Sequence, residues 1–204
     1  MLRALAVGAS IVVLGAVSVA WYFGQSSNDL AQCSGSTVVG GDIGGPFELV
    51  NASGQTVTDV DVITEPSLVY FGYTYCPDVC PFDVSRNADA VDLLAQQGLS
   101  ATPVFVTIDP RRDTPEIISD YAENMHEKMI ALTGSDQQIA QASRAYKTYY
   151  KAQDDGTDEY LVDHSTFTYL VFPDVGFVEF FRRDVTAELM AERTACFIEN
   201  MPDV

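Results

Sequence analysis

Residues 67–81 read SLVYFGYTYCPDVCP, and this stretch decides the fold. Its first five residues, Ser67 to Phe71, are mostly apolar and favour a short strand buried on both faces. Two cysteines, Cys76 and Cys80, follow in a proline-rich turn, and apolar residues at helical spacing continue after Pro81. The stretch therefore predicts a central strand, a turn that carries two thiols, and then a helix.

Strands and helices alternate on both sides of this stretch. The expected strands lie at residues 46–50, 56–62, 67–71, 102–108, 129–133, 166–172 and 177–181. The expected helices lie at residues 82–97, from residue 114 onward, at 135–149 and at 188–200. This order predicts a thioredoxin-like α/β fold, a central mixed sheet flanked by helices with an N-terminal hairpin extension.

Hydropathy divides the chain into three parts. Residues 4–23 contain no charged residue and are long enough to span a bilayer, so residues 1–24 are predicted to be a transmembrane anchor. Residues 25–45 are rich in Gly and Ser and predict a flexible tether, followed by one domain at residues 46–204. Arg3 precedes the apolar run, which predicts a single-pass protein of the inner membrane with its C-terminal domain in the periplasm. A signal peptide cleaved before Trp21 is the alternative.

The chain is strongly acidic. Its 204 residues include 29 acidic and 11 basic side chains, for a formal net charge of −18. Nucleic-acid binding is excluded on this basis, because phosphate recognition needs a basic surface. An apolar content of 47% is ample for a packed core and excludes a disordered chain.

Cys76, Cys80 and His164 have the side chains best suited to bind a metal ion. Three residues separate the cysteines, which places both sulfurs on one face near a helix start, where the thiolate is favoured. Two thiolates and one imidazole suit Cu(I), and the imidazole also accepts Cu(II). Zinc uses the same ligand types but usually takes a fourth one in a structural site, so copper is favoured. A structural disulfide between Cys76 and Cys80 is the alternative.

Three blocks resemble the signature sequences of the Sco/SenC family. They are YFGYTYCPDVCP at residues 70–81, TIDPRRDTP at residues 107–115 and VDHS at residues 162–165. The family is similar to thioredoxin in fold, is membrane-anchored and faces the periplasm or the mitochondrial intermembrane space. The resemblance implies that Cys76, Cys80 and His164 bind copper. It also implies as partners cytochrome c oxidase subunit II, whose dinuclear copper centre the family serves, or another copper-accepting protein, together with a thiol reductant.

Two carboxylates are predicted to tune this site from just outside the ligands. Asp163 precedes His164, and Asp109 ends the second buried strand on the same side of the sheet as the cysteines. A solvated strand-end carboxylate at Asp163 is the alternative. At Asp109 the alternative is a turn held by an Asp–Arg pair with Arg111 or Arg112.

The remaining cysteines and the second histidine lie outside the three blocks. A disulfide between Cys33 and Cys196, tying the tether to the last helix, is one of the pairings that four cysteines allow, and the sequence does not choose among them. Cys196 as a small buried hydrophobe is the alternative. His126 is predicted to face solvent rather than to form a second copper site.

The predicted function is that of a copper metallochaperone and not of an enzyme. Reduced Cys76 and Cys80, with His164, hold copper and pass it on by ligand exchange, while oxidation to a disulfide prevents binding. Two alternatives stay open: a thiol-disulfide oxidoreductase in which Cys76 and Cys80 are the redox-active pair, and a redox or copper sensor. His164 argues against the first, because a dithiol reductase has no need of a third metal ligand.

Overall fold

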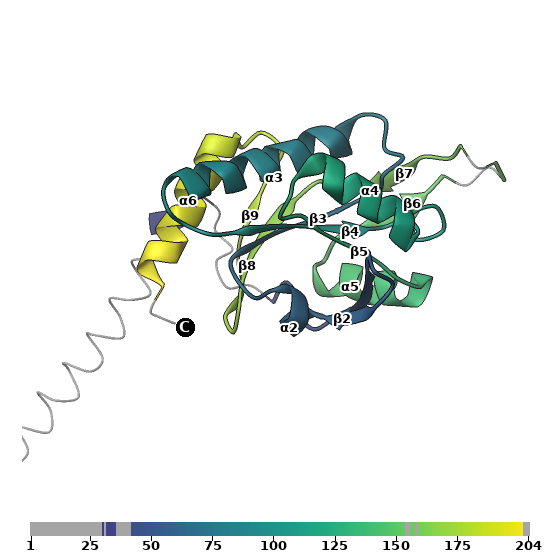
Figure 1. Ribbon diagram of the computed structural model, residues 1–204, viewed down its shortest axis with the longest axis horizontal. Coiled ribbons are helices and arrows are strands. Elements are labelled where there is room, and N and C mark those ends of the chain that lie inside the picture. Colours follow the sequence, from purple (N-terminus) through teal and green to yellow (C-terminus); the bar gives the residue numbers. More distant parts are fainter. Residues whose placement is uncertain (1–29, 31, 36–41, 154–155, 158, 202–204) are drawn as a thin grey trace, which may run out of the picture.

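The structure, a computed structural model, describes residues 30, 32–35, 42–153, 156–157 and 159–201. Seven strands form one mixed sheet in the order β2-β1-β5-β4-β3-β8-β9, and two further strands pair separately as β6-β7 (Figure 1). The strands are β1 (Glu48–Asn51), β2 (Thr56–Thr58), β3 (Ser67–Gly72), β4 (Thr102–Thr107), β5 (Ile130–Thr133), β6 (Tyr150–Ala152), β7 (Val162–His164), β8 (Thr168–Phe172) and β9 (Gly176–Phe181). The helices are α2 (Asp59–Val62), α3 (Val79–Gln96), α4 (Pro115–Met125), α5 (Asp136–Ala145) and α6 (Ala187–Asn200).

Strand β3 lies in the interior of the sheet, next to the middle strand β4. All six of its residues are buried, and it pairs parallel with β4 on one side and antiparallel with β8 on the other. Helices α3 and α4 cover one face of the sheet, α5 lies on the other, and α6 packs beside α3 (Figure 1). Because β3 and β4 are parallel, the turns after their carboxyl ends lie at the same edge of the sheet. The predicted thioredoxin-like α/β fold with a mixed sheet is confirmed.

The N-terminal hairpin extends this sheet but is shorter than predicted. Strand β1 pairs antiparallel with both β2 and β5, which adds two strands at the edge. The expected strand over residues 56–62 ends at Thr58, because the Thr58 backbone N–H and hydroxyl both donate to the Asp61 carboxylate and cap the short helix α2. Local capping therefore overrides the apolar alternation in this segment.

Three elements near the predicted site differ from expectation. Helix α3 begins at Val79, before Pro81, because proline is tolerated in the first turn of a helix. Helix α5 ends at Ala145 instead of residue 149, and Lys147 then takes a left-handed conformation with φ of 52°. The chain continues into β6, which pairs with β7 in a two-stranded ribbon that the sequence did not predict.

Cys33 and Cys196, whose pairing the sequence left open, form a disulfide that joins the N-terminal segment to α6. The next two residues are bound to β9: the Ser34 hydroxyl and the Gly35 N–H donate to the buried Glu179 carboxylate at 2.7 and 2.8 Å. Residues 33–35 of the predicted tether are therefore fixed to the domain.

The predicted single-pass localisation in the inner membrane requires correction. No helix among the described residues combines the length and the apolar character needed to cross a bilayer. The segment on which the prediction depended, residues 4–23 within the proposed anchor 1–24, lies outside the described residues.

Candidate metal centre

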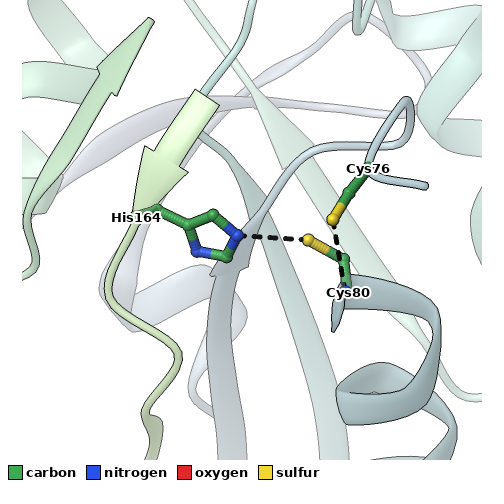
Figure 2. Close-up of side chains that lie close together, drawn as sticks. All are labelled: Cys76, Cys80 and His164. Carbon is green, nitrogen blue, oxygen red and sulfur yellow. Dashed lines mark hydrogen bonds between the residues drawn. The ribbon is translucent and has the colours of Figure 1, made fainter. Parts of the chain in front are cut away.

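The three predicted ligands converge at one edge of the sheet (Figure 2). Cys76 lies in the loop after β3, Cys80 in the first turn of α3, and His164 at the end of β7. One ligand atom from each lies within 4.8 Å of the others. Both cysteines are free thiols; Cys80 is fully buried and Cys76 is 7% exposed, so Cys76 forms the outer edge of the site.

The orientation of the His164 ring leaves its Nε2 atom available as a ligand. Nδ1 lies 2.8 Å from the carbonyl oxygen of Ser165, so Nδ1 carries the proton and donates it to that carbonyl. Nε2 then presents its lone pair 3.3 Å from Cys80 Sγ (Figure 2). Burial lowers the pKa of the His164 imidazole, which favours the neutral form that binds metals.

The two thiols differ in acidity. Burial disfavours the Cys76 thiolate, but hydrogen bonds from the backbone N–H groups of Asp78, Cys80 and Val79 outweigh it and lower the pKa of Cys76. The Cys80 N–H is 3.4 Å from Cys76 Sγ. For Cys80, burial is the main cause of a raised pKa, and the neighbouring Cys76 sulfur raises it further. The outer thiol, Cys76, is therefore the more acidic of the two, and the inner thiol, Cys80, is the less acidic.

This difference predicts the order in which the thiols react. A lowered pKa means that Cys76 forms the reactive thiolate at lower pH. The rate of its alkylation should therefore reach half its maximum at a pH below about 8.5, the ordinary pKa of a cysteine thiol. At pH 7 it should react more than about 10-fold faster than Cys80. Iodoacetamide labelling of the reduced, metal-free protein from pH 5 to 9, read by site-resolved mass spectrometry, measures both rates. In the control Cys76→Ser, labelling should be slow throughout; equal rates in the unmodified protein would contradict the prediction.

A glycine at the end of β3 allows Cys80 to approach the sheet. A Cβ atom on Gly72 would lie 3.1 Å from Cys80 Sγ and 2.8 Å from Cε1 of Tyr70. Any larger residue would therefore push the inner sulfur or the Tyr70 ring out of place.

A buried carboxylate fixes the cysteine loop. Asp113 is fully buried, and it accepts hydrogen bonds from the Thr74 backbone N–H at 3.0 Å and from the hydroxyls of Thr74 and Thr107. The Thr133 hydroxyl donates to its carbonyl at 2.7 Å. Asp113 thus joins the loop before Cys76 to the ends of β4 and β5. Burial raises the pKa of Asp113, and the three donors to its side chain oppose that rise.

The predicted outer carboxylates have different surroundings. Asp109 accepts the Tyr160 hydroxyl proton at 2.7 Å and an N–H from Arg112, so it contacts the segment that leads to His164. Asp163 is exposed and accepts both of its hydrogen bonds, each 2.9 Å long, from the Gln153 amide. Neighbours on a strand point to opposite faces, so Asp163 faces away from its neighbour's ring. The predicted tuning role of both carboxylates stays a prediction.

His126 lies apart from this centre. Its Nδ1 accepts the Lys128 backbone N–H at 3.1 Å, and its Nε2 lies 3.3 Å from the Asp92 carboxylate. Both ring nitrogens are therefore occupied at the end of α4.

Aromatic residues at the site were not singled out from the sequence. The rings of Tyr70 and Tyr73 meet the His164 ring edge-on, with centroids 6.2 and 5.9 Å away. The Tyr73 hydroxyl also accepts the Val162 backbone N–H at 3.3 Å. Both tyrosines occur in the block at residues 70–81. Their closeness in sequence to the two cysteines is the feature that could have identified them as residues of the site.

Comparisons with known proteins agree with this fold. The SCO1/SenC family model matches residues 36–199. Protein SenC of Rhodobacter capsulatus is 49% identical over 198 residues, which are 96% of this chain and 90% of that protein. The mitochondrial SCO1 homolog 1 of Arabidopsis thaliana is 36% identical over 160 residues, 78% of this chain but 48% of that protein, so the chain spans about half of that relative.

A solved structure is similar as well. The crystal structure of Arabidopsis thaliana ScoI with copper bound has a TM-score of 0.72 and 34% sequence identity, covering 77% of this chain and 99% of that one. These findings confirm the resemblance that the three sequence blocks indicated. The chain belongs to the SCO1/SenC family.

Proposed function

We propose that this protein binds copper and delivers it to the dinuclear copper centre of cytochrome c oxidase subunit II. The observation that carries the proposal is the convergence of two free thiols and an imidazole with an available Nε2 atom. The copper bound by the plant ScoI structure supports it, as does the description of the Sco family as cytochrome c oxidase assembly proteins.

The donor set suits copper as cargo. Cys76 Sγ, Cys80 Sγ and His164 Nε2 would hold the ion, and soft sulfur donors favour Cu(I). The hydrogen bond to the Ser165 carbonyl holds the imidazole in the required tautomer. Cys80 must lose its proton when copper binds, so loading releases a proton and becomes easier as pH rises. Cys76 at the outer edge is the ligand that an incoming partner thiolate would displace first.

A transfer experiment tests this function. The full chain, reduced and loaded anaerobically with one equivalent of Cu(I), is mixed with the metal-free, reduced copper domain of subunit II. After separation, most of the copper is expected on the acceptor. An acceptor with serines in place of its copper-binding cysteines is the control and should receive none. Retention of copper by the loaded chain in the presence of the intact acceptor would overturn the delivery role.

The lowered pKa of Cys76 favours a second candidate function, reduction of the acceptor's cysteines. The Cys76 thiolate would attack one sulfur of the partner's disulfide, and the other sulfur leaves as a thiolate. Cys80, after losing its proton, would attack the Cys76 sulfur and release the second partner thiolate. Two electrons pass to the partner, Cys76 and Cys80 become a disulfide, and a thiol reductant must regenerate them.

The residue requirements separate the two functions. Disulfide reduction needs Cys76 and Cys80 but not His164, whereas copper binding needs all three. With metal-free protein and an oxidised acceptor domain, thiol counting should show reduction by His164→Ala at the rate of the unmodified protein. Cys80→Ser should accumulate a mixed disulfide through Cys76. The absence of that adduct, with no thiols formed by the unmodified protein, would exclude the reductase role.

A further inference from the structure

Arg112 lies between the two chain segments that carry the candidate ligands. The cysteines belong to the loop and helix that follow β3, whereas His164 belongs to the β6-β7 ribbon, which is not paired with the seven-stranded sheet. Among the described residues, no backbone ladder joins β7 directly to the loop or the helix that carries the cysteines. Side-chain contacts therefore help to set the distance between Nε2 and the two sulfurs, and the Arg112 side chain, only 10% exposed, is central among them.

On the histidine side, Arg112 forms a closed set of contacts with Tyr160 and Asp109. The guanidinium carbon lies 3.8 Å from the centroid of the Tyr160 ring. The Arg112 Nε–H donates to one Asp109 oxygen, and the Tyr160 hydroxyl donates to the other at 2.7 Å. Tyr160 is buried and lies two residues before β7. These contacts fix the start of the segment that ends at His164.

On the cysteine side, the same guanidinium contacts two more rings. Its carbon lies 4.9 Å from the ring centroid of Tyr75, the residue before Cys76, and 5.6 Å from that of Tyr73. All three distances are within the range of cation–π attraction. Tyr73 in turn accepts the Val162 N–H and touches the His164 ring. Arg112 thus contacts both ligand-bearing segments at once.

We propose that Arg112 is a positioning residue, which holds the segment of residues 160–164 against the cysteine loop and so sets the approach of His164 Nε2 to the sulfurs. A planar guanidinium suits this role, because it can stack on one ring while its edge donates to Asp109. The proposal deepens the proposed copper-binding function. It also makes a claim about His164 in the metal-free protein that holds whether or not copper is the cargo.

Nuclear magnetic resonance of the metal-free, reduced full chain tests that claim directly. The chain has two histidines, so His126 serves as an internal reference. In Arg112→Met the imidazole signals of His164 should shift or broaden while those of His126 stay unchanged. The control Arg144→Met removes a positive charge from the exposed end of α5 and should leave both histidines unchanged. His164 signals identical to those of the unmodified protein in Arg112→Met would overturn the proposal.

Cu(I) affinity is a second measurement. If Arg112 only stabilised the fold, its replacement would weaken Cu(I) binding equally with and without His164. Arg112→Met should weaken binding by about 10- to 100-fold, as for other residues that orient a ligand. In a His164→Ala background the same change should cause little further loss, because the ligand that Arg112 orients is gone. An equal loss in both backgrounds would contradict positioning through His164.

Arg112→Lys keeps the test decisive if the methionine variant does not fold. Lysine retains the charge but not the plane that stacks on Tyr160, so a smaller change in the His164 signals and in Cu(I) affinity is expected. Unchanged His164 signals in this folded variant would overturn the proposal. If the unmodified protein binds no Cu(I), the proposed function is wrong, while the His164 signals still decide the role of Arg112.

Discussion

Replacing His164 with alanine is expected to weaken Cu(I) binding by more than about 100-fold. Residues that only orient a ligand typically cost 10- to 100-fold in metal affinity, and His164 would supply the ligand atom itself. The change leaves both thiols in place, so a weak two-coordinate site remains. Competition with a chromophoric Cu(I) chelator, under anaerobic conditions and with the reduced full chain, measures the loss.

His126→Ala is the matched control for this prediction. Its ring nitrogens bind Lys128 and Asp92 at the end of α4, away from the cysteines, so Cu(I) affinity should not change. Equal affinities of His164→Ala and the unmodified protein would contradict a three-ligand site. A loss in both histidine variants would instead indicate a general effect on folding.

Removing the disulfide between Cys33 and Cys196 is expected to lower the free energy of unfolding by about 2–5 kcal/mol. The two cysteines are 163 residues apart, so the bond restricts the unfolded chain over nearly the whole domain. It also holds Ser34 and Gly35 against Glu179, whose buried carboxylate loses two donors when that segment detaches. Urea unfolding of the double variant Cys33→Ser, Cys196→Ser, without added reductant, measures the change.

A variant that lacks only one of these hydrogen bonds gives a reference value for the loss of unfolding free energy. Ser34→Ala removes one donor to the buried Glu179 carboxylate but keeps the disulfide and the Gly35 donor, and it should cost about 1.5–3 kcal/mol. The disulfide variant should be clearly less stable than Ser34→Ala. The same urea midpoint for both would show that the covalent bond adds nothing to the hydrogen bonds it accompanies.

Much of the fold could be predicted because its central strands are continuous apolar runs bounded by turns. Residues 67–71 and 102–108 are such runs, and they became β3 and β4. The β6-β7 ribbon could not be predicted in the same way, since strands of three residues carry too little periodicity. The sequence predicts the start of α3 after Pro81, whereas the helix begins at Val79 and holds Pro81 in its first turn, where proline is tolerated.

In the candidate site, features that depend on residues close in sequence could be predicted, whereas contacts between distant segments could not. Cys76 and Cys80 are close in sequence, so their shared helix start could be predicted. The partner of the His164 ring depends on strand orientation, and it is the Ser165 carbonyl rather than the Asp163 carboxylate. The stacking of Arg112 on Tyr160 joins residues far apart in the chain, and no local pattern indicates it.

The bond between Cys33 and Cys196 also makes most of this protein a covalently closed ring. A protease cut in the connection between β6 and β7 would leave both cysteine ligands on one fragment and His164 on the other. The first fragment carries Cys33 and the second carries Cys196, so the two pieces stay one molecule. A single break in the backbone therefore cannot dissociate the three ligands from one another while this disulfide is intact.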